Sequence, residues 1–231
     1  MKILGVVGGL GPESTIEYYR RLITAYQKQA DDKSLPHVLI NSIDVYRGLA
    51  YLDANELDLL ADYLAEAVAT LASAGADFAI ISANAPHLVL DQVQARCKLP
   101  LISIVEAACA EAQRRSITRI GLLGTRFTMQ ARFYPDVFAR AGVTVVVPNE
   151  PEIAYTHDKY INELLKGICL SDTREGLLQI VGRMRREEHV EAVLLAGTEL
   201  PLILSEDTID GLPLLDTTKI HVEAAVARLL A

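Results

Sequence analysis

Gly5-Val6-Val7-Gly8-Gly9, near the start of the chain, and Gly121-Leu122-Leu123-Gly124, past its middle, are two versions of one pattern. Each is a short apolar run that ends on glycine and is followed by a longer stretch with helical periodicity. Continuous Val-, Ile- and Leu-rich runs that alternate with amphipathic helices are typical of βαβ units around a parallel sheet. The pattern therefore predicts an α/β fold.

Two further pairs of segments recur at nearly the same spacing. Phe78–Ala83 followed by Asn84 matches Ala192–Gly197 followed by Thr198, and Leu99–Ile102 matches Leu212–Leu215. Three matches that keep nearly one offset favour a duplicated unit over a chance likeness between βαβ segments. We therefore expect two pseudo-symmetric domains, each with a four-stranded, mostly parallel sheet flanked by helices.

The expected strands and domain limits follow from these runs. The strands are residues 3–8, 37–43, 77–82, 100–103, 119–124, 143–147, 191–196 and 213–216. Residues 1–103 and 213–231 are assigned to the first domain, with the C-terminal helix returning to it, and residues 104–212 to the second. Ligands of open parallel sheets bind beyond the carboxyl ends of the strands, so a ligand cleft is expected between the domains.

Composition excludes several classes of protein. The net charge of −8 without a basic stripe speaks against a nucleic-acid surface, and no apolar run is long enough to cross a membrane. The three cysteines have neither disulfide-framework nor zinc-site spacing, and the histidines lack metal-ligand spacing. Since the chain starts directly on a strand-like run, we expect a cytoplasmic protein. Since neither the cysteines nor the histidines have metal-ligand spacing, we expect no metal.

The segment Gly8–Thr15 follows the first strand and opens a helix. Its backbone N–H groups are suited to a carboxylate or a phosphate, although a tight turn without a ligand explains the glycines equally well. The dinucleotide fingerprint is incomplete, because Gly9 and Gly11 are followed by Ser14 where a third glycine is required.

Small and polar residues end two of the apolar strands. Ser82-Ala83-Asn84-Ala85-Pro86-His87 follows one, and Ala196-Gly197-Thr198-Glu199 follows its counterpart. Asn84 and Thr198 can each orient a carboxylate or an amine, although both residue types are also common in turns. Their matching positions favour a role in ligand binding.

Four other side chains are candidates with an ordinary structural alternative. Thr125 and Thr128 can face a carboxylate or only cap the next helix, and Arg47 can clamp a second carboxylate or lie exposed in a loop. Lys166 can contact the ligand or only complement a helix dipole. Of these two roles, we favour the helix dipole. His87 lies where a base is possible, although a histidine at a helix start is more often structural.

Taken together, these motifs resemble the cofactor-independent aspartate/glutamate racemase family, of the broad-specificity bacterial amino-acid type, over nearly the whole chain. The resemblance rests on Gly8–Thr15, Asn84-x-x-His87, Leu123-Gly124-Thr125, Gly197-Thr198-Glu199 and Leu215-Asp216-Thr217. It implies a homodimer without a cofactor that acts at the α-carbon of an amino acid or a similar small carboxylate. The positions that it implies for substrate binding are Gly9, Ser14, Arg47, Asn84, Ala85, Thr125, Thr128, Lys166 and Thr198.

The chain departs from the family at the residues that carry the proton. Family members use one cysteine at each strand tip to remove and return the α-proton, and the matching positions here are Ala83 and Gly197. The threonine that the family has after Asn84 is Ala85. Because neither Ala nor Gly titrates, the two-thiol mechanism is not available, and loss of one acid–base group alone costs about 10²- to 10⁴-fold.

Two functions remain open from the sequence. The first is an isomerase or lyase that uses Glu199 or His87 in place of a thiol, and the second is a catalytically silent relative that holds a small carboxylate. The first is the one we favour. We also expect that the paired substitution Ala83→Cys and Gly197→Cys would create or raise racemase activity.

Overall fold

The computed structural model describes residues 2–30 and 34–231, and the chain forms two compact units. The first unit comprises residues 1–104 and 218–231, and the second comprises residues 105–217. The chain therefore leaves the first unit after Ile104 and returns to it at Thr218. Both units are built from parallel strands and helices, which confirms the predicted α/β class.

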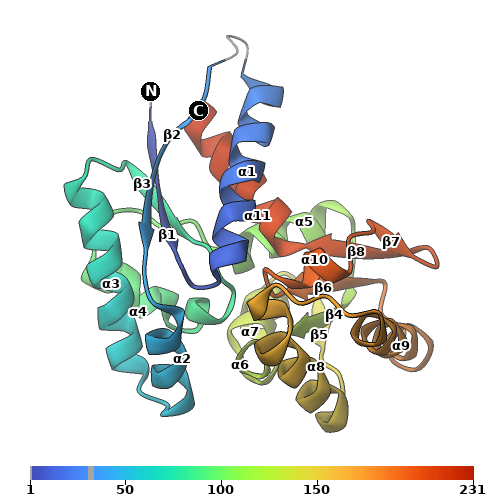
Figure 1. The fold of residues 1–231 in the computed structure, drawn as a ribbon. Helices are drawn as coiled ribbons and strands as arrows, with labels where there is room; N and C mark the ends of the chain where they lie inside the picture. The colour runs from blue at the N-terminus through green and yellow to red at the C-terminus, as the bar shows by residue number, and fades with distance from the viewer. Residues whose placement is uncertain (1, 31–33) are drawn as a thin grey trace. The chain divides into compact units, whose positions relative to one another are not determined.

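The first unit contains a parallel sheet in the order β2-β1-β3 (Figure 1). Its strands are β1 (Ile3–Gly8), β2 (His37–Ser42) and β3 (Phe78–Ile81). Its helices are α1 (Pro12–Gln29), α2 (Val45–Asp53), α3 (Leu57–Ser73), the 3-10 helix η1 (Ala85–Val89), α4 (Leu90–Arg96) and α11 (Thr217–Leu230).

Helices cover both faces of this sheet, which is why β1 and β3 are apolar without alternation. Leu4 and Val6 pack with residues of α1 and α11 on one face. Gly5 faces α3 on the other, where an added Cβ would lie 3.1 Å from the Leu71 side chain. The carboxyl ends of β1 and β3 are thereby fixed beside each other, with Val7 opposite Ile81.

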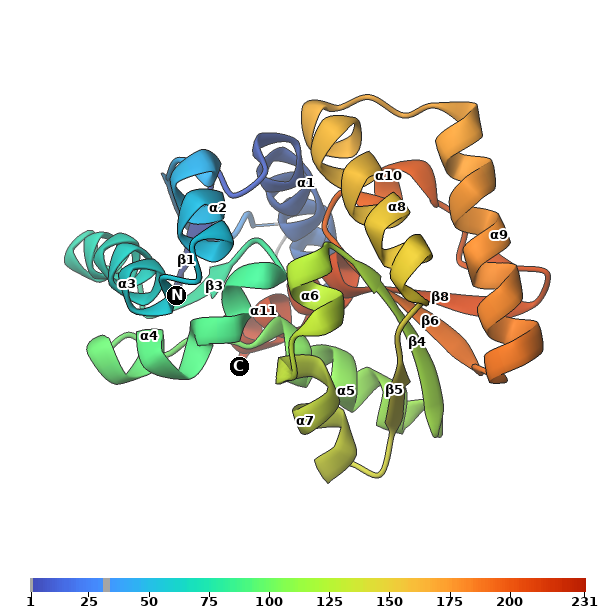
Figure 2. The ribbon, with the colours of Figure 1, turned by 90° about the horizontal axis from the view of Figure 1, so that it is seen from below.

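The second unit contains five strands in the order β5-β4-β6-β8-β7. Figure 2 labels β5, β4, β6 and β8, and Figure 1 labels β7. The strands are β4 (Arg119–Gly124), β5 (Thr144–Val146), β6 (Ala192–Ala196), β7 (Thr208–Ile209) and β8 (Leu212–Asp216). The helices are α5 (Ile104–Arg114), α6 (Arg126–Gln130), α7 (Phe133–Arg140), α8 (Glu150–Asn162), the 3-10 helix η2 (Leu164–Lys166), α9 (Ser171–Glu188) and α10 (Leu200–Ile203).

Helices α8 and α9 pack on one face of the second sheet. Leu123 and Leu195 share an apolar cluster with Tyr160 of α8 and Leu177 of α9. Helix α8 is held at its start by a capping box, in which the Asn149 side chain accepts from the Glu152 N–H and the Glu152 carboxylate accepts from the Asn149 N–H. This cap fixes the helix that carries Tyr160 toward the end of β6.

The expected number of four strands in each sheet is wrong within the described residues. The segment around Leu101 pairs with β3 only through an isolated parallel bridge to Ala79. Pro100 contributes its carbonyl to this pairing but has no N–H to donate, so the ladder stays short. The second sheet gains the antiparallel β7, a two-residue strand that forms a hairpin with β8.

The expected domain limit at residue 213 is also displaced. Strand β8 pairs with β6, with Val193 opposite Leu214, and so belongs to the second unit rather than the first. The limit near residue 103 agrees closely with the observed division after Ile104. Because β8 pairs with β6, it stays in the second sheet, and only α11 after it returns to the first unit.

Arg47 lies in a helix and not in a loop. Residues 45–53 form α2, which Asp44 caps by accepting from the Tyr46 N–H, and α10 begins at Leu200, shortly after β6 ends at Ala196. Over the part of the chain that the structure describes, no helix is long and apolar enough to cross a membrane.

Candidate functional site

The carboxyl ends of β1 and β3 form what we call the first edge, residues 8–15 and 82–87. The Ser14 hydroxyl donates to the carbonyl of Gly11 at 2.9 Å and lies 3.4 Å from the carbonyl of Ser82. Ser14 is fully buried, so this contact ties the loop after β1 to the end of β3. The first edge is therefore one packed structure and not two separate loops.

Thr15 of α1 forms hydrogen bonds with the backbone of the glycine loop at the first edge. The Gly9 N–H donates to the Thr15 hydroxyl at 2.9 Å, and the Thr15 hydroxyl donates to the Gly11 carbonyl at 3.0 Å. Gly9 has a φ of +79°, and a Cβ there would overlap the backbone of Ile43. These contacts favour the tight-turn interpretation and take one of the N–H groups that the sequence offered to an anion.

The segment after β3 is buried and short of reactive groups. The Ser82 hydroxyl donates to the Val7 carbonyl at 3.0 Å, so it is used to join β3 to β1. Ala83 is 7% exposed and Asn84 is 4% exposed. Asn84 precedes η1, which begins at Ala85, and its carbonyl accepts from the His87 N–H at 3.0 Å.

His87 has both ring nitrogens occupied by backbone groups. Its Nδ1 lies 2.9 Å from the Ala83 carbonyl, and its Nε2 accepts from the Ile104 N–H at 3.2 Å. Burial, and then the neighbouring His221, lower the pKa of His87 to about 3. This imidazole is neutral at pH 7 and has no nitrogen left for a substrate, which argues against its use as a base.

His221 is a partner that the sequence did not reveal. Its ring centroid lies 5.9 Å from that of His87, its Nδ1 lies 3.0 Å from the Tyr18 hydroxyl, and its Nε2 lies 2.9 Å from the Ile102 carbonyl. Burial lowers its pKa to about 4. A helical histidine 134 residues beyond His87 gives no sequence signal of this pairing.

The carboxyl ends of β4 and β6 form the second edge, residues 124–128 and 196–199. Gly124 lies opposite Ala196, so the two segments are neighbours. The Thr125 hydroxyl caps α6 by accepting from the Thr128 N–H at 3.4 Å, and the two hydroxyls lie 3.3 Å apart. Both threonines are buried, and the capping role that the sequence left open for Thr125 is observed.

A buried carboxylate lies at the end of β6. Glu199 is 1% exposed, and its Oε2 accepts from the Thr198 hydroxyl at 2.8 Å and from the Tyr160 hydroxyl. Tyr160 comes from α8, 39 residues earlier in the chain. Sequence reasoning missed it because Tyr160 lies on the apolar face of its helix with Ile153 and reads as a core residue.

The ring of Tyr160 fills the space beside Gly197. A Cβ built on Gly197 would lie 3.2 Å from both Cζ and Oη of Tyr160, and closer still to Cε2. The built Cβ overlaps Cε2, so a cysteine at position 197 requires Tyr160 to move. The paired substitution Ala83→Cys and Gly197→Cys therefore stays a prediction, and the position of Tyr160 bears on its outcome.

Arg47 and Lys166 lie in exposed positions. The Arg47 Nε donates to the Tyr51 hydroxyl at 3.0 Å, and its guanidinium stands 4.6 Å from the Tyr63 ring centroid. The hydrogen bond to Tyr51 raises the pKa of Arg47 above its already high usual value. Lys166 ends η2 and precedes Gly167, as the helix-end interpretation predicts.

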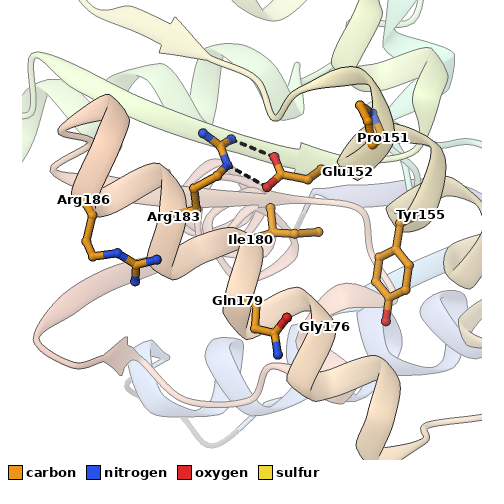
Figure 3. Close-up of a pocket in the computed structure, with 8 residues that line it drawn as sticks. All are labelled: Pro151, Glu152, Tyr155, Gly176, Gln179, Ile180, Arg183 and Arg186. Carbon is orange, nitrogen blue, oxygen red and sulfur yellow. Dashed lines mark hydrogen bonds and ion pairs between the residues drawn. The ribbon is translucent and has the colours of Figure 1, made fainter.

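A pocket of about 440 Å³ lies elsewhere in the second unit, between α8 and α9 (Figure 3). Arg183 forms a two-point ion pair with Glu152 at 2.6 and 2.7 Å on its wall, and none of the predicted site residues line it. Within residues 2–30 and 34–231, no group of three or more His, Cys, Asp or Glu residues is placed to hold a metal ion.

Comparison with known proteins agrees with this architecture. The family model of the Asp/Glu/hydantoin racemases matches residues 7–225. The chain is 23% identical over 235 residues to the broad-specificity amino-acid racemase RacX of Bacillus subtilis, covering 99% of both proteins.

Two solved structures share the whole fold. A candidate Asp/Glu racemase from Yersinia pestis is 29% identical with a TM-score of 0.88, and an aspartate racemase homologue from Pyrococcus horikoshii is 31% identical with a TM-score of 0.85. Both alignments cover 100% of this chain and 100% of the other. The chain therefore belongs to the Asp/Glu/hydantoin racemase family.

Proposed function

We propose that this protein binds an amino acid or a similar small carboxylate and acts at its α-carbon without a cofactor, using groups other than thiols. The observation that carries the proposal is the second edge of a racemase-family fold. There, the hydroxyls of Thr125, Thr128 and Thr198 and the Glu199 carboxylate come from two neighbouring strand ends.

The chemistry of the second edge fits a small polar ligand. Hydroxyl groups can both donate to a carboxylate and accept from an ammonium group, so three of them can orient an amino acid from more than one side. A carboxylate in a buried setting is a group that catalytic sites use as an acid or a base. The edge thus offers both orientation and a titratable group.

A catalytically silent binding protein is the second candidate function. It is favoured by a specific observation, which is that Ala83 and Gly197 carry no titratable proton at the two positions where the family has cysteines. The same hydroxyls would then bind and orient a carboxylate that is released unchanged.

Exchange of the α-hydrogen separates the two candidates. Purified protein is incubated in deuterated water with the L- and D-forms of aspartate, glutamate and a panel of neutral amino acids, and loss of the α-proton signal is followed by NMR. Binding of each compound is measured in parallel by calorimetry. We expect binding and exchange above a boiled control. Binding without exchange supports the silent candidate. The absence of both binding and exchange would end the proposal.

A further inference from the structure

The space that a side chain at position 197 would occupy is taken by a phenol. The Tyr160 hydroxyl oxygen lies 3.2 Å from the Cβ position of Gly197, on a ring that itself overlaps that position. According to the family resemblance, this is the position from which a thiol would extend toward the ligand. The glycine has therefore not left an empty space, because an oxygen that carries a proton stands close to it.

The same hydroxyl is held by a buried carboxylate. Tyr160 donates to Oε2 of Glu199, which also accepts from Thr198, and the Glu199 N–H lies 3.4 Å from the Tyr160 oxygen. Burial, and then the adjacent Glu199 carboxylate, raise the pKa of Tyr160 well above its usual value. The phenol is thus protonated at neutral pH and can lose its proton only to a neighbour such as Glu199.

Apolar packing alone does not account for the hydroxyl of Tyr160. Tyr160 belongs to the apolar cluster of the second unit, and a phenylalanine would fill the same volume without a hydroxyl. Burying a carboxylate costs free energy unless it is hydrogen-bonded, so Glu199 is an expensive partner for a mere packing residue. The pair lies at the strand end, where family members place their reactive group.

We propose that Tyr160 and Glu199 together replace the second thiol as a proton-carrying pair, with the phenol hydroxyl beside Gly197 facing the substrate α-carbon. This inference rests on the proposed function, because it names the group that would perform it. It assigns the reactive role to a residue of α8 and not to the residue that follows β6 directly.

The step balances without a cofactor or an outside reagent. The Tyr160 oxygen takes the proton from the α-carbon as its own proton passes to the Glu199 carboxylate. The electron pair of the broken C–H bond stays on the substrate and is delocalised into its carboxylate. Before the return step, the protons held by Tyr160 and Glu199 exchange with solvent deuterium. In the return step, Glu199 gives its deuteron to the phenol oxygen as that oxygen passes its own deuteron to the α-carbon.

A single proton-carrying pair has a stereochemical consequence. Removal and return then occur on one face of the α-carbon, since the same phenol oxygen takes the proton and gives one back. We therefore expect exchange with retention, in which one enantiomer gains deuterium much faster than its mirror image appears. A two-sided racemase would show inversion at a rate comparable with exchange.

The test compares three single substitutions in the full chain. Tyr160→Phe removes only the hydroxyl, Glu199→Gln removes the charge, and Tyr155→Phe is the matched control, since it removes a phenol hydroxyl from the same helix. Exchange is measured in deuterated water by NMR, inversion by chiral chromatography, and affinity by calorimetry. Circular dichroism and thermal melting verify that each variant is folded.

We expect Tyr160→Phe and Glu199→Gln each to lower the exchange rate by about 10²-fold or more, with affinity changed by less than about threefold. Tyr155→Phe should keep the wild-type rate. Exchange that survives Tyr160→Phe overturns this inference and leaves the proposed function standing. Wild-type protein that binds without exchange overturns the inference in favour of the silent candidate, and wild-type protein that does neither overturns both proposals.

Discussion

In the first unit, the peptide after β3 carries an imidazole whose two nitrogens contact backbone groups, whereas in the second unit the peptide after β6 carries a carboxylate that contacts a phenol. The two edges share their topology, with a parallel strand pair and a polar segment at its carboxyl end. His87 has both ring nitrogens bound by backbone groups, while the Tyr160 hydroxyl, held by Glu199, lies beside Gly197. A shared scaffold therefore does not imply that both halves keep the same chemistry.

The strongest way to break this contrast is to give both edges a thiol. In the triple variant Ala83→Cys, Gly197→Cys, Tyr160→Ala, the ring that blocks position 197 is absent, so each edge has a thiol and the one at position 197 no longer overlaps Tyr160. We expect racemisation to rise by about 10²-fold or more over the wild type, since each added acid–base group contributes on that scale. Chiral chromatography measures it, with the double cysteine variant that keeps Tyr160 as the control. A folded triple variant that binds ligand without inversion would show that the edges have diverged in shape.

The second prediction concerns the loss of stability in acid, which we expect to come from the two buried histidines of the first unit. The folded chain holds the pKa of His87 at about 3 and that of His221 at about 4, whereas in the unfolded chain both lie near 6.5. Because the unfolded state binds more protons below pH 6.5, stability is full above that pH and falls as the pH drops. Two such groups imply a loss on the order of 3–5 kcal/mol between pH 6.5 and 4.

The measurement for this second prediction is urea unfolding followed by circular dichroism across the pH range. His87→Asn is the comparison, since it removes one of the two titrating groups and should flatten the slope. An unchanged slope in that variant would place the acid sensitivity in carboxylates instead.

Single cysteines should reveal a difference in space between the edges. Gly197→Cys forces its side chain into the Tyr160 ring, and overpacking of a core costs about 1–3 kcal/mol. Ala83→Cys only enlarges an existing side chain, so we expect a smaller loss. Urea midpoints at pH 7 compare the two variants. Equal midpoints for both single variants would contradict the overlap.

The smallest effect concerns the threonines of the second edge. Thr125→Ala removes the side-chain cap of α6, and loss of such a cap costs about 1 kcal/mol. Thr198→Val keeps the shape but removes the hydroxyl that donates to Glu199. We expect Thr125→Ala to lower the melting temperature by a few degrees, and Thr198→Val to weaken ligand binding more than it lowers stability. If Thr125→Ala weakened ligand binding more than Thr198→Val did, ligand recognition would be assigned to Thr125 and not to Thr198.

Much of the fold was predictable because its central strands are written locally. Strands β1, β4 and β6 are continuous apolar runs that end at glycine or alanine, and burial on both faces requires such runs. The loop considered for Arg47 is helix α2, whose nine residues contain Gly48 and start from the turn-like Asp44, so its helical character is weak in the sequence. The displacement of β8 depends on which strand it pairs with, and local sequence does not specify pairing.

The site was predictable only in part. Thr125, Thr128 and Thr198 were predicted as binding residues because they come shortly after strand ends, and the structure places them at the second edge. Tyr160 was not found, because its hydroxyl reaches Glu199 from a helix that reads as purely apolar on that side. A contact between distant elements depends on the tertiary fold, and no spacing rule reveals it.

The two buried histidines must differ in which nitrogen carries hydrogen. Since the Ile104 N–H can only donate, Nε2 of His87 accepts, and the single hydrogen of the neutral ring lies on Nδ1. Since the Ile102 carbonyl can only accept, His221 has its hydrogen on Nε2, and its Nδ1 accepts from Tyr18. Neighbouring imidazoles frozen as opposite tautomers would give two distinct pairs of ¹⁵N resonances, and these signals would report from inside the first unit whether its packing survives each substitution.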